Sequence, residues 1–116
     1  MPGYMLLLHS PTDENAGLSA EEIQSVIEDY MAWRDTIASE DRLLGGDKLT
    51  DEGGRHLRNE NGAIRITDGP YAEVKEALGG YFSIKAANYE EAAAITKTCP
   101  HLKYGGWIEL RQIDEH

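Results

Sequence analysis

Hydrophobic and polar positions divide the first half of the chain into strand-like and helix-like segments. Tyr4–His9 is a short apolar run, which predicts a central strand. Ser19 and Glu22 have the spacing of a capping box, and apolar residues then recur at helical spacing to about Ser39. Leu43–Leu49 predicts a weaker strand with a bulge or a close approach at its two central glycines.

The middle of the chain predicts a hairpin followed by a long connection. Arg55–Arg58 and Ala63–Thr67 flank a turn whose Asn61-Gly62 pair adopts positive φ angles at low cost. A plain hairpin connection needs about 2–5 residues, and the connection between Thr67 and Gly80 is longer. Its apolar residues at i, i+3 and i+7 predict one or two helical turns over Tyr71–Leu78.

The last third predicts a strand, a helix and a strand. Gly80–Ala86 alternates between apolar and polar residues, as a half-buried strand does. Asn88 is placed to cap a helix that ends before Pro100. Trp107–Ile113 alternates again and predicts the final strand.

This order predicts one α+β domain spanning residues 1–116, with a ferredoxin-like split βαβ antiparallel sheet and both helices on one face. The other sheet face then needs a ligand, solvent or a partner chain. The strand phases place on it Tyr81, Ser83, Lys85, Trp107, Glu109, Arg111 and Ile113, with Met5, Leu7 and His9 if the first strand shares that phase. Such a mixed face suits a homodimer that encloses a polar cavity for a small molecule.

The amino-acid composition disfavours some classes of binding partner. The chain is 41% hydrophobic and 28% charged, which is typical of a globular domain. Its net charge of −10 disfavours nucleic acid and anionic membranes as partners. One cysteine, Cys99, excludes an intrachain disulfide, and the apolar run Met5–Leu8 is too short for a signal peptide or a membrane span. These features predict a cytoplasmic protein.

A long central motif carries a resemblance to a known family. DGPYAEVKEALGGYFSI, followed by a capped helix ending in CP, a glycine pair and IELRQ, resembles the YCII-related family, in particular its DGPF-domain branch. The similarity runs from YMLLLH to IELRQ. It implies a ferredoxin-like fold that pairs as a dimeric α/β barrel. Biochemical function in the family is mostly unassigned, a His–Asp pair in a cleft suggests enzymes, and some branches are encoded or fused with sigma factors.

The resemblance makes Asp68 a candidate catalytic residue, because it matches the motif aspartate. The family takes its histidine from the first helix, but Ser19–Ser39 contains none, so His9 is the substitute partner that we consider. Each has a structural alternative: Asp68 as an acceptor in an Asx turn, and His9 as a strand-end residue bonded to backbone. Tyr71 stands where the motif usually has Phe.

The remaining candidates are pocket residues rather than catalytic groups. We expect them to be Trp33, Tyr71, Tyr81, Ser83, Lys85, Trp107, Glu109 and Arg111. Trp33 lies off the main apolar stripe of its helix, which predicts partial exposure toward the pocket or dimer edge. Glu109 and Arg111 are expected to pair with each other or with the second copy. No histidine or cysteine spacing matches a zinc site, so we expect no metal and no cofactor.

Three functions remain open from the sequence. The first is a small-molecule protein with a pocket between the open sheet face and the Asp68–Gly80 loop, and any catalysis there would be of lyase or isomerase type. The second is an accessory or regulatory dimer that binds without turnover. The third is a structural dimer without a site.

Overall fold

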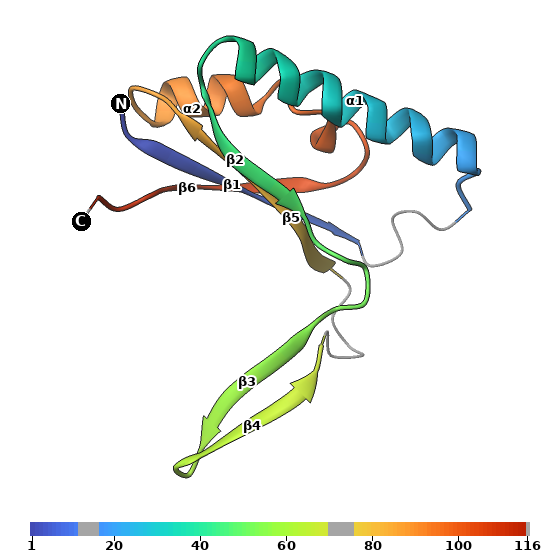
Figure 1. Ribbon diagram of the computed structural model, residues 1–116, viewed down its shortest axis with the longest axis vertical. Helices are drawn as coiled ribbons and strands as arrows, with labels where there is room; N and C mark the ends of the chain where they lie inside the picture. The colour runs from blue at the N-terminus through green and yellow to red at the C-terminus, as the bar shows by residue number, and fades with distance from the viewer. Residues whose placement is uncertain (12–16, 70–75, 116) are drawn as a thin grey trace.

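The structure is a computed structural model that describes residues 1–11, 17–69 and 76–115. The described chain forms six strands, two α-helices and one 3-10 turn (Figure 1). In chain order these are β1 (Gly3–Pro11), α1 (Ala20–Ser39), β2 (Leu43–Lys48), β3 (Arg55–Glu60), β4 (Ala63–Asp68), β5 (Glu76–Lys85), α2 (Tyr89–Thr96), η1 (Pro100–Leu102) and β6 (Trp107–Gln112).

The main sheet has four strands in the order β2-β5-β1-β6, and every neighbouring pair is antiparallel. Both helices lie on the same side of this sheet (Figure 1). α1 connects β1 to β2, with β5 between these two strands, and α2 connects β5 to β6, with β1 between them. The predicted α+β class with antiparallel strands and two helices is therefore confirmed.

Both helices begin where the sequence predicts. The Glu22 amide donates to Ser19 Oγ at 3.1 Å, and the Ser19 amide donates to Glu22 Oε1 at 3.2 Å. These two bonds satisfy amides that a helix start otherwise leaves unpaired. At α2 the Glu91 amide donates to Asn88 Oδ1 at 2.9 Å in the same way.

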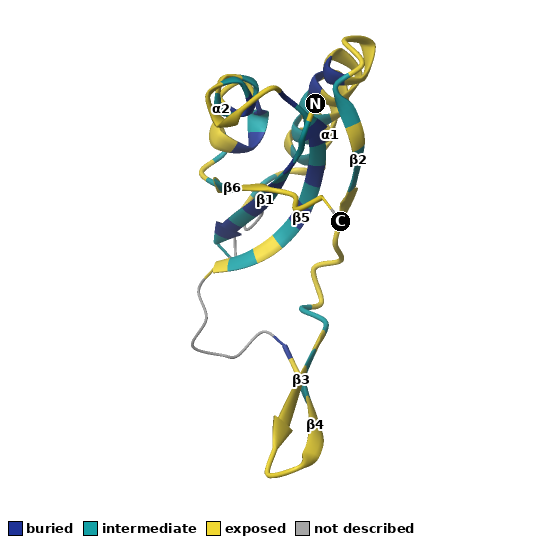
Figure 2. Cartoon of the chain, turned by 90° about the vertical axis from the view of Figure 1, so that its left-hand side faces the viewer, coloured by how far each residue is buried: buried dark blue, intermediate teal, exposed yellow. Residues whose placement is uncertain are grey.

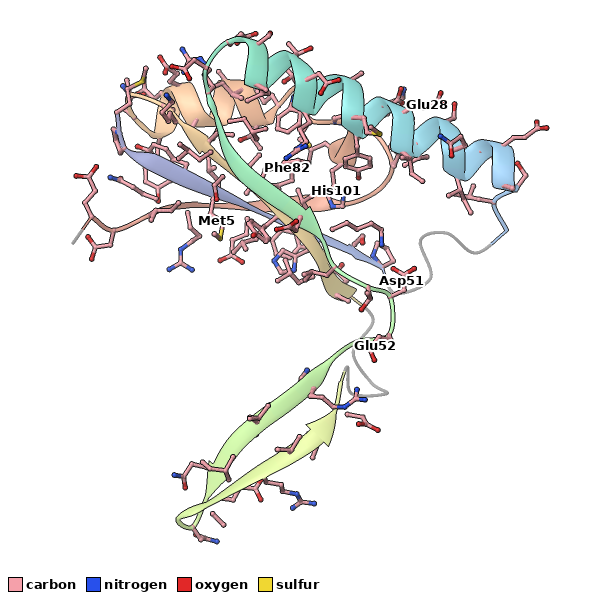
Figure 3. All side chains as sticks on the ribbon, viewed as in Figure 1. Met5, Glu28, Asp51, Glu52, Phe82 and His101 are labelled. Atoms are coloured by element: carbon pink, nitrogen blue, oxygen red, sulfur yellow. The ribbon has the colours of Figure 1, made fainter. Side chains whose placement is uncertain are left out.

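The core fills the space between the sheet and the helices. Residues alternate along β1 and β5, so that every second side chain is buried beneath the helices (Figure 2). Figure 3 shows Phe82 between the sheet and α1, and Met5 on the opposite side of the sheet. The buried hydrophobic residues are Tyr4, Leu6, Leu8, Trp33, Ile37, Phe82, Ile84, Ala86, Ala92 and Cys99.

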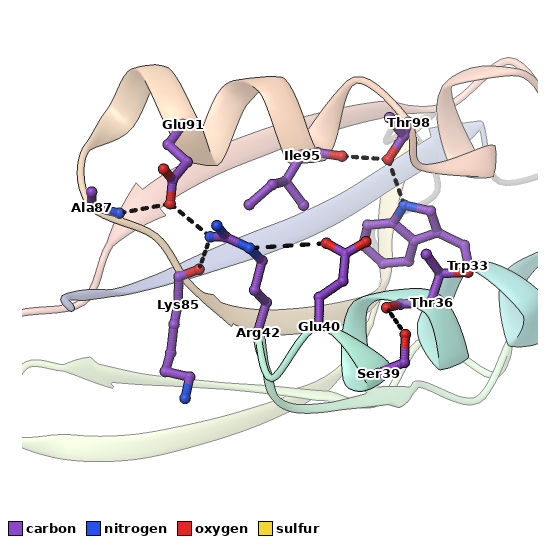
Figure 4. A network of polar contacts seen from close by, with 10 residues as sticks. All are labelled: Trp33, Thr36, Ser39, Glu40, Arg42, Lys85, Ala87, Glu91, Ile95 and Thr98. Carbon is purple, nitrogen blue, oxygen red and sulfur yellow. Dashed lines mark hydrogen bonds and ion pairs between the residues drawn. The ribbon is translucent and has the colours of Figure 1, made fainter.

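Trp33 is one of these core residues, so the prediction that it is partly accessible is wrong. Only 7% of it is exposed, and its ring meets Phe82 edge to face at 5.1 Å between centroids. Its indole Nε1 donates to Thr98 Oγ1 at 2.8 Å (Figure 4). A hydrogen-bond acceptor close to α1 allows the indole to be buried, because its N–H remains satisfied.

An ion pair joins the residue before β2 to α2 on the helix side. Arg42 Nη1 donates to Glu91 Oε1 at 2.6 Å and to the Lys85 carbonyl at 3.3 Å (Figure 4). The hydrogen bond from Arg42 lowers the pKa of Glu91, and a bond from the Ala87 amide lowers it further. Glu91 therefore stays ionised to a lower pH than an ordinary glutamate.

The predicted hairpin is present and stands apart from the main sheet. β3 and β4 pair only with each other among the described strands, and Figures 1 and 2 show them extending away from the sheet and helices. Asn61 and Gly62 have φ angles of 54° and 86°, as the turn requires. We call the segment 55–68 the arm and the rest of the chain the body.

The sequence predicts a helical turn over Tyr71–Leu78, but the described part of that segment is not helical. Residues 70–75 lie outside the described residues, whereas Glu76–Leu78 begin β5. β1 extends to Pro11 and supplies ladder partners for these residues, so pairing prevails over the local helical pattern. The register shifts between Leu8 and His9, because Leu8 pairs with Gly80 and His9 with Leu78.

Candidate functional site

The face of the main sheet that carries no helix brings polar side chains from three strands together. On β1 the alternation leaves Met5, Leu7 and His9 on this face, which resolves the phase that the sequence left open. Antiparallel register places Trp107 opposite His9, and Glu109 opposite Leu7. Directly opposed residues share a face, so His9, Trp107 and Glu109 are neighbours.

His9 and Glu109 form the central pair of the site. His9 Nε2 lies 3.3 Å from Glu109 Oε1, and the two residues are 100 positions apart in the sequence. The His9 ring stacks on Trp107, with centroids 4.2 Å apart and planes inclined by 10°. The carboxylate and the indole together hold the imidazole in one orientation. Among the described residues no hydrogen bond reaches Nδ1 of His9, and 22% of the side chain is exposed.

Arg111 keeps Glu109 ionised. Its Nη1 donates to Glu109 Oε2 at 3.1 Å, which is the first of the two pairings that the sequence left open. This bond is the largest cause of the lowered pKa of Glu109; burial opposes it, and the bond from His9 lowers the pKa as well. At neutral pH Glu109 is therefore an acceptor, and the N–H of His9 that points toward it is Nε2–H.

Trp107 is anchored by a residue that sequence reasoning missed. Its Nε1 donates to Glu76 Oε2 at 2.7 Å. Glu76 is the first residue of β5, in the segment that the sequence predicts to be helical. The contact depends on the extension of β5 alongside β1, for which the sequence contains no local signal.

A second polar pair lies on the β2 side of the same face. Tyr81 donates to Asp47 Oδ2 at 3.0 Å, and this hydrogen bond raises the pKa of the Tyr81 hydroxyl. Leu7 separates the pair from Glu109, because Leu7 is opposite Tyr81 on one side and Glu109 on the other. Of the other predicted residues, Ser83 lies opposite Met5, and Lys85 contacts Asp41 at 3.1 Å at the end of β5.

A buried histidine supports the site from the helix side. His101 is 4% exposed and lies between the sheet and α1 (Figure 3). Its Nε2 lies 2.7 Å from the backbone oxygen of His9, and its Nδ1 lies 2.6 Å from the Tyr30 hydroxyl. A carbonyl only accepts, so Nε2 carries the proton and Nδ1 accepts from Tyr30. His101 therefore fixes the backbone directly beneath the His9 side chain.

The structure does not bring Asp68 to His9, which corrects the pairing that we considered from the sequence. Asp68 ends β4 in the arm with 88% of its side chain exposed, and its carboxylate contacts Arg55 Nε at 3.3 Å. The partner of His9 is Glu109, one strand away in the sheet. Tyr71, and the predicted contacts of Asp68 with the turn that follows it, lie outside the described residues.

Other kinds of site can be assessed only for the described part of the chain. Within residues 1–11, 17–69 and 76–115, no group of three or more His, Cys, Asp or Glu side chains is placed to hold a metal ion. No helix in those ranges is long and apolar enough to cross a membrane. Cys99 is buried, and this burial raises the pKa of its thiol to about 11.

One known protein family matches almost the whole chain. The model of the YCII-related domain matches residues 4–115. The chain belongs to the YCII-related family. The match includes every strand that contributes to the open face. No curated protein matches this chain significantly, so the function of this YCII-related protein has to be argued from its own residues.

Proposed function

We propose that this YCII-related protein binds a small polar molecule on the open sheet face, with His9 and Glu109 as an acid–base pair. The observation that carries the proposal is the geometry of His9. Its ring is bonded to Glu109 through Nε2 and stacked on Trp107, which leaves Nδ1 without a hydrogen bond from the described residues. An imidazole that is oriented by a carboxylate is a common arrangement for proton transfer.

The chemistry that suits this pair is removal and return of a proton, as in a lyase or an isomerase. His9 would take the proton at Nδ1, and Glu109 would stabilise the imidazolium that forms. Arg111 contacts Glu109 through one guanidinium nitrogen and is largely exposed, so its remaining donors could hold a substrate carboxylate. We therefore favour small carboxylic acids as the substrate class.

We further infer a DGPF-type protein with a ferredoxin-like fold that pairs as a dimeric α/β barrel. The DGPYAEVKEALGG motif supports the branch. The strand order β2-β5-β1-β6 with two helix-containing crossovers supports the fold. Pairing of two copies through the open faces would shield the exposed side chains of Leu44, Trp107 and Ile113 and enclose the polar groups.

A second function is binding without turnover, in an accessory or regulatory dimer, for instance one that acts with a sigma factor. The acidic charge and the mixed open face are compatible with it. Proton exchange separates the two functions. An enzyme of the proposed type should exchange a substrate C–H for deuterium in D2O, observed by NMR, and His9→Ala should abolish this exchange. An accessory protein should bind the same compound without exchange.

The two tryptophans provide an internal control for a binding experiment. Trp107 lies on the open face, whereas Trp33 is buried beneath α1. We would screen small carboxylic acids by thermal shift and follow hits by the two indole N–H signals in a 15N NMR spectrum. A ligand at the proposed site should shift the Trp107 signal and leave the Trp33 signal in place. Hits that shift only the Trp33 signal would contradict the site.

Matched carboxamide variants test the acid–base pair. Glu109→Gln keeps the shape of the side chain but removes the charge that would stabilise the imidazolium, so the rate of substrate C–H exchange should fall about tenfold or more. Glu28→Gln makes the same chemical change on the exposed surface of α1, where Glu28 accepts only from Gln24 among the described residues (Figure 3). It should leave the exchange rate unchanged. Equal effects of the two variants would show that only the total charge matters.

A further inference from the structure

The arm presents a continuous apolar surface to solvent. Leu57 is directly opposite Ile66 in the β3–β4 register, and Ile64 is opposite Asn59 on the same face. Leu57, Ile64 and Ile66 are 62%, 62% and 63% exposed. Large apolar side chains scattered singly on a surface are ordinary, but three on one face of a projecting hairpin form a patch.

An isolated two-stranded hairpin is marginally stable in water, because it has no layer against which to bury an apolar face. The body does not supply that layer, since the arm extends away from the main sheet and helices (Figure 2). The defined turn at Asn61-Gly62 and the full six-residue register nevertheless specify a regular hairpin. A surface outside this chain would complete it.

We propose that the apolar face of the arm packs against the body of a second copy of this chain, so that two copies clasp one another. This arrangement is isologous: the arm of each copy contacts the same surface of the other, and each contact is made twice. It goes beyond the proposed function, because it assigns a role to a segment that contributes nothing to the His9–Glu109 site.

Charge complementarity favours a second copy as the occupant. The arm carries three arginines and two acidic residues, Glu60 and Asp68, so its net charge is +1. The whole chain has a net charge of −10, so the body carries −11. Arg58 and Arg65 lie on the other face of the hairpin, where Arg65 contacts Glu60 at 3.2 Å, so they take no part in the apolar contact. The acidic body of a second copy suits the net positive charge of the arm. The same acidic body disfavours an anionic membrane as the occupant.

The area of the surfaces also favours a clasp. A four-stranded sheet with about six paired residues per strand offers about 400 Å² on one face, from the usual strand spacing and rise. A stable interface buries about 800 Å² of accessible surface per partner, and this flat area of the open faces is about half that number. One face of the arm adds about 200 Å², and the partner surface beneath the other arm adds about as much. Together the arm contacts about double the flat area over which the two copies can touch.

Sedimentation equilibrium of the full chain tests the proposal. The triple variant Leu57→Ser, Ile64→Ser, Ile66→Ser removes the apolar arm face and should raise the dimer dissociation constant at least about tenfold. The control Ile27→Ser, Met31→Ser removes exposed apolar side chains from α1 instead and should leave the constant within about twofold. Circular dichroism of each variant verifies that the body is folded.

Photo-crosslinking tests the position of the arm without depending on the stability of the triple variant. A photoreactive phenylalanine analogue replaces Ile66 in 15N-labelled chains, which are mixed with unlabelled wild-type chains. Crosslinked peptides that join labelled and unlabelled chains, with the unlabelled partner residue in the body, are expected. Crosslinks confined to one chain would overturn the proposal.

The outcomes separate the clasp from the dimer that we infer under the proposed function. A wild-type monomer at all accessible concentrations overturns both. A dimer whose dissociation constant is the same in wild type and in the triple variant overturns the clasp and leaves pairing through the open faces standing. If the triple variant and the α1 control weaken the dimer equally, the clasp is also overturned. Selective weakening together with interchain crosslinks from position 66 supports it.

Discussion

Gly106→Ala is expected to destabilise the protein through one methyl group. A Cβ at position 106 would lie 2.2 Å from His101 Nε2 and 2.5 Å from His101 Cε1, whereas ordinary contact begins at 3.4 Å. Gly106 is therefore required for space, because the His101 ring occupies the volume that any side chain would need. The ring cannot move away freely, since hydrogen bonds to Tyr30 and to the His9 carbonyl hold both of its nitrogens.

The expected cost follows from these contacts. The ring or the start of β6 has to shift by about 1 Å to accept the methyl group, and an overpacked core typically loses about 1–3 kcal/mol. Losing the two hydrogen bonds of His101 would cost about 1 kcal/mol each. We therefore expect the free energy of unfolding to fall by about 2–4 kcal/mol. For a chain of this length that lowers the melting temperature by about 8–16 °C.

Urea denaturation measures this loss, and Gly45→Ala is the matched control. A Cβ at Gly45 meets nothing within 4 Å, so the same chemical change should alter the free energy of unfolding by less than about 1 kcal/mol. The 15N NMR spectrum should also report on the site. Displacement of His101 moves the backbone beneath His9, so the indole signal of Trp107, which stacks on His9, should shift in Gly106→Ala.

A double-mutant cycle decides whether the His101 ring is the cause. In a His101→Ala background the ring is absent, so Gly106→Ala should cost less than about 1 kcal/mol. The coupling energy between the two positions should then be at least about 1 kcal/mol. If Gly106→Ala is equally destabilising with and without the imidazole, the steric reasoning is refuted.

Three further predictions concern the core and the helix side of the sheet. Cys99 should resist a thiol reagent at neutral pH in the native protein and react fully in urea, because it is buried with a thiol pKa of about 11; rapid native labelling would contradict this. Glu91→Gln removes the ion pair with Arg42. Because folding lowers the pKa of Glu91 from 4.5, the stability it contributes should be present above pH 4.5 and disappear as the pH falls through the folded-state pKa, so urea midpoints of variant and wild type should converge in acid. Trp33→Phe loses the hydrogen bond to Thr98 and should lower the free energy of unfolding by about 1–2 kcal/mol, whereas an unchanged urea midpoint would show that this bond contributes nothing net.

Features with a local physical cause were predictable from the sequence. The helix starts at Ser19 and Asn88 depend on side chains that bond amides within three residues, and the hairpin depends on the Asn61-Gly62 turn. The alternation of Gly80–Ala86 and Trp107–Ile113 correctly assigned their two faces, because side-chain direction in a strand alternates residue by residue. This alternation placed Tyr81, Trp107, Glu109 and Arg111 on the face without helices.

Features that depend on which distant segments meet were decided by the tertiary structure. His9 pairs with Glu109 rather than Asp68 because β1 and β6 are neighbours in the sheet, and their register sets the pair across 100 residues. Trp33 became a core residue because Thr98 offers an acceptor to its indole. The roles of His101 and Glu76 were not predicted either, because their contacts join segments that are far apart in the sequence. Strand order and register arise from burial of the whole core, and no short window of residues contains that information.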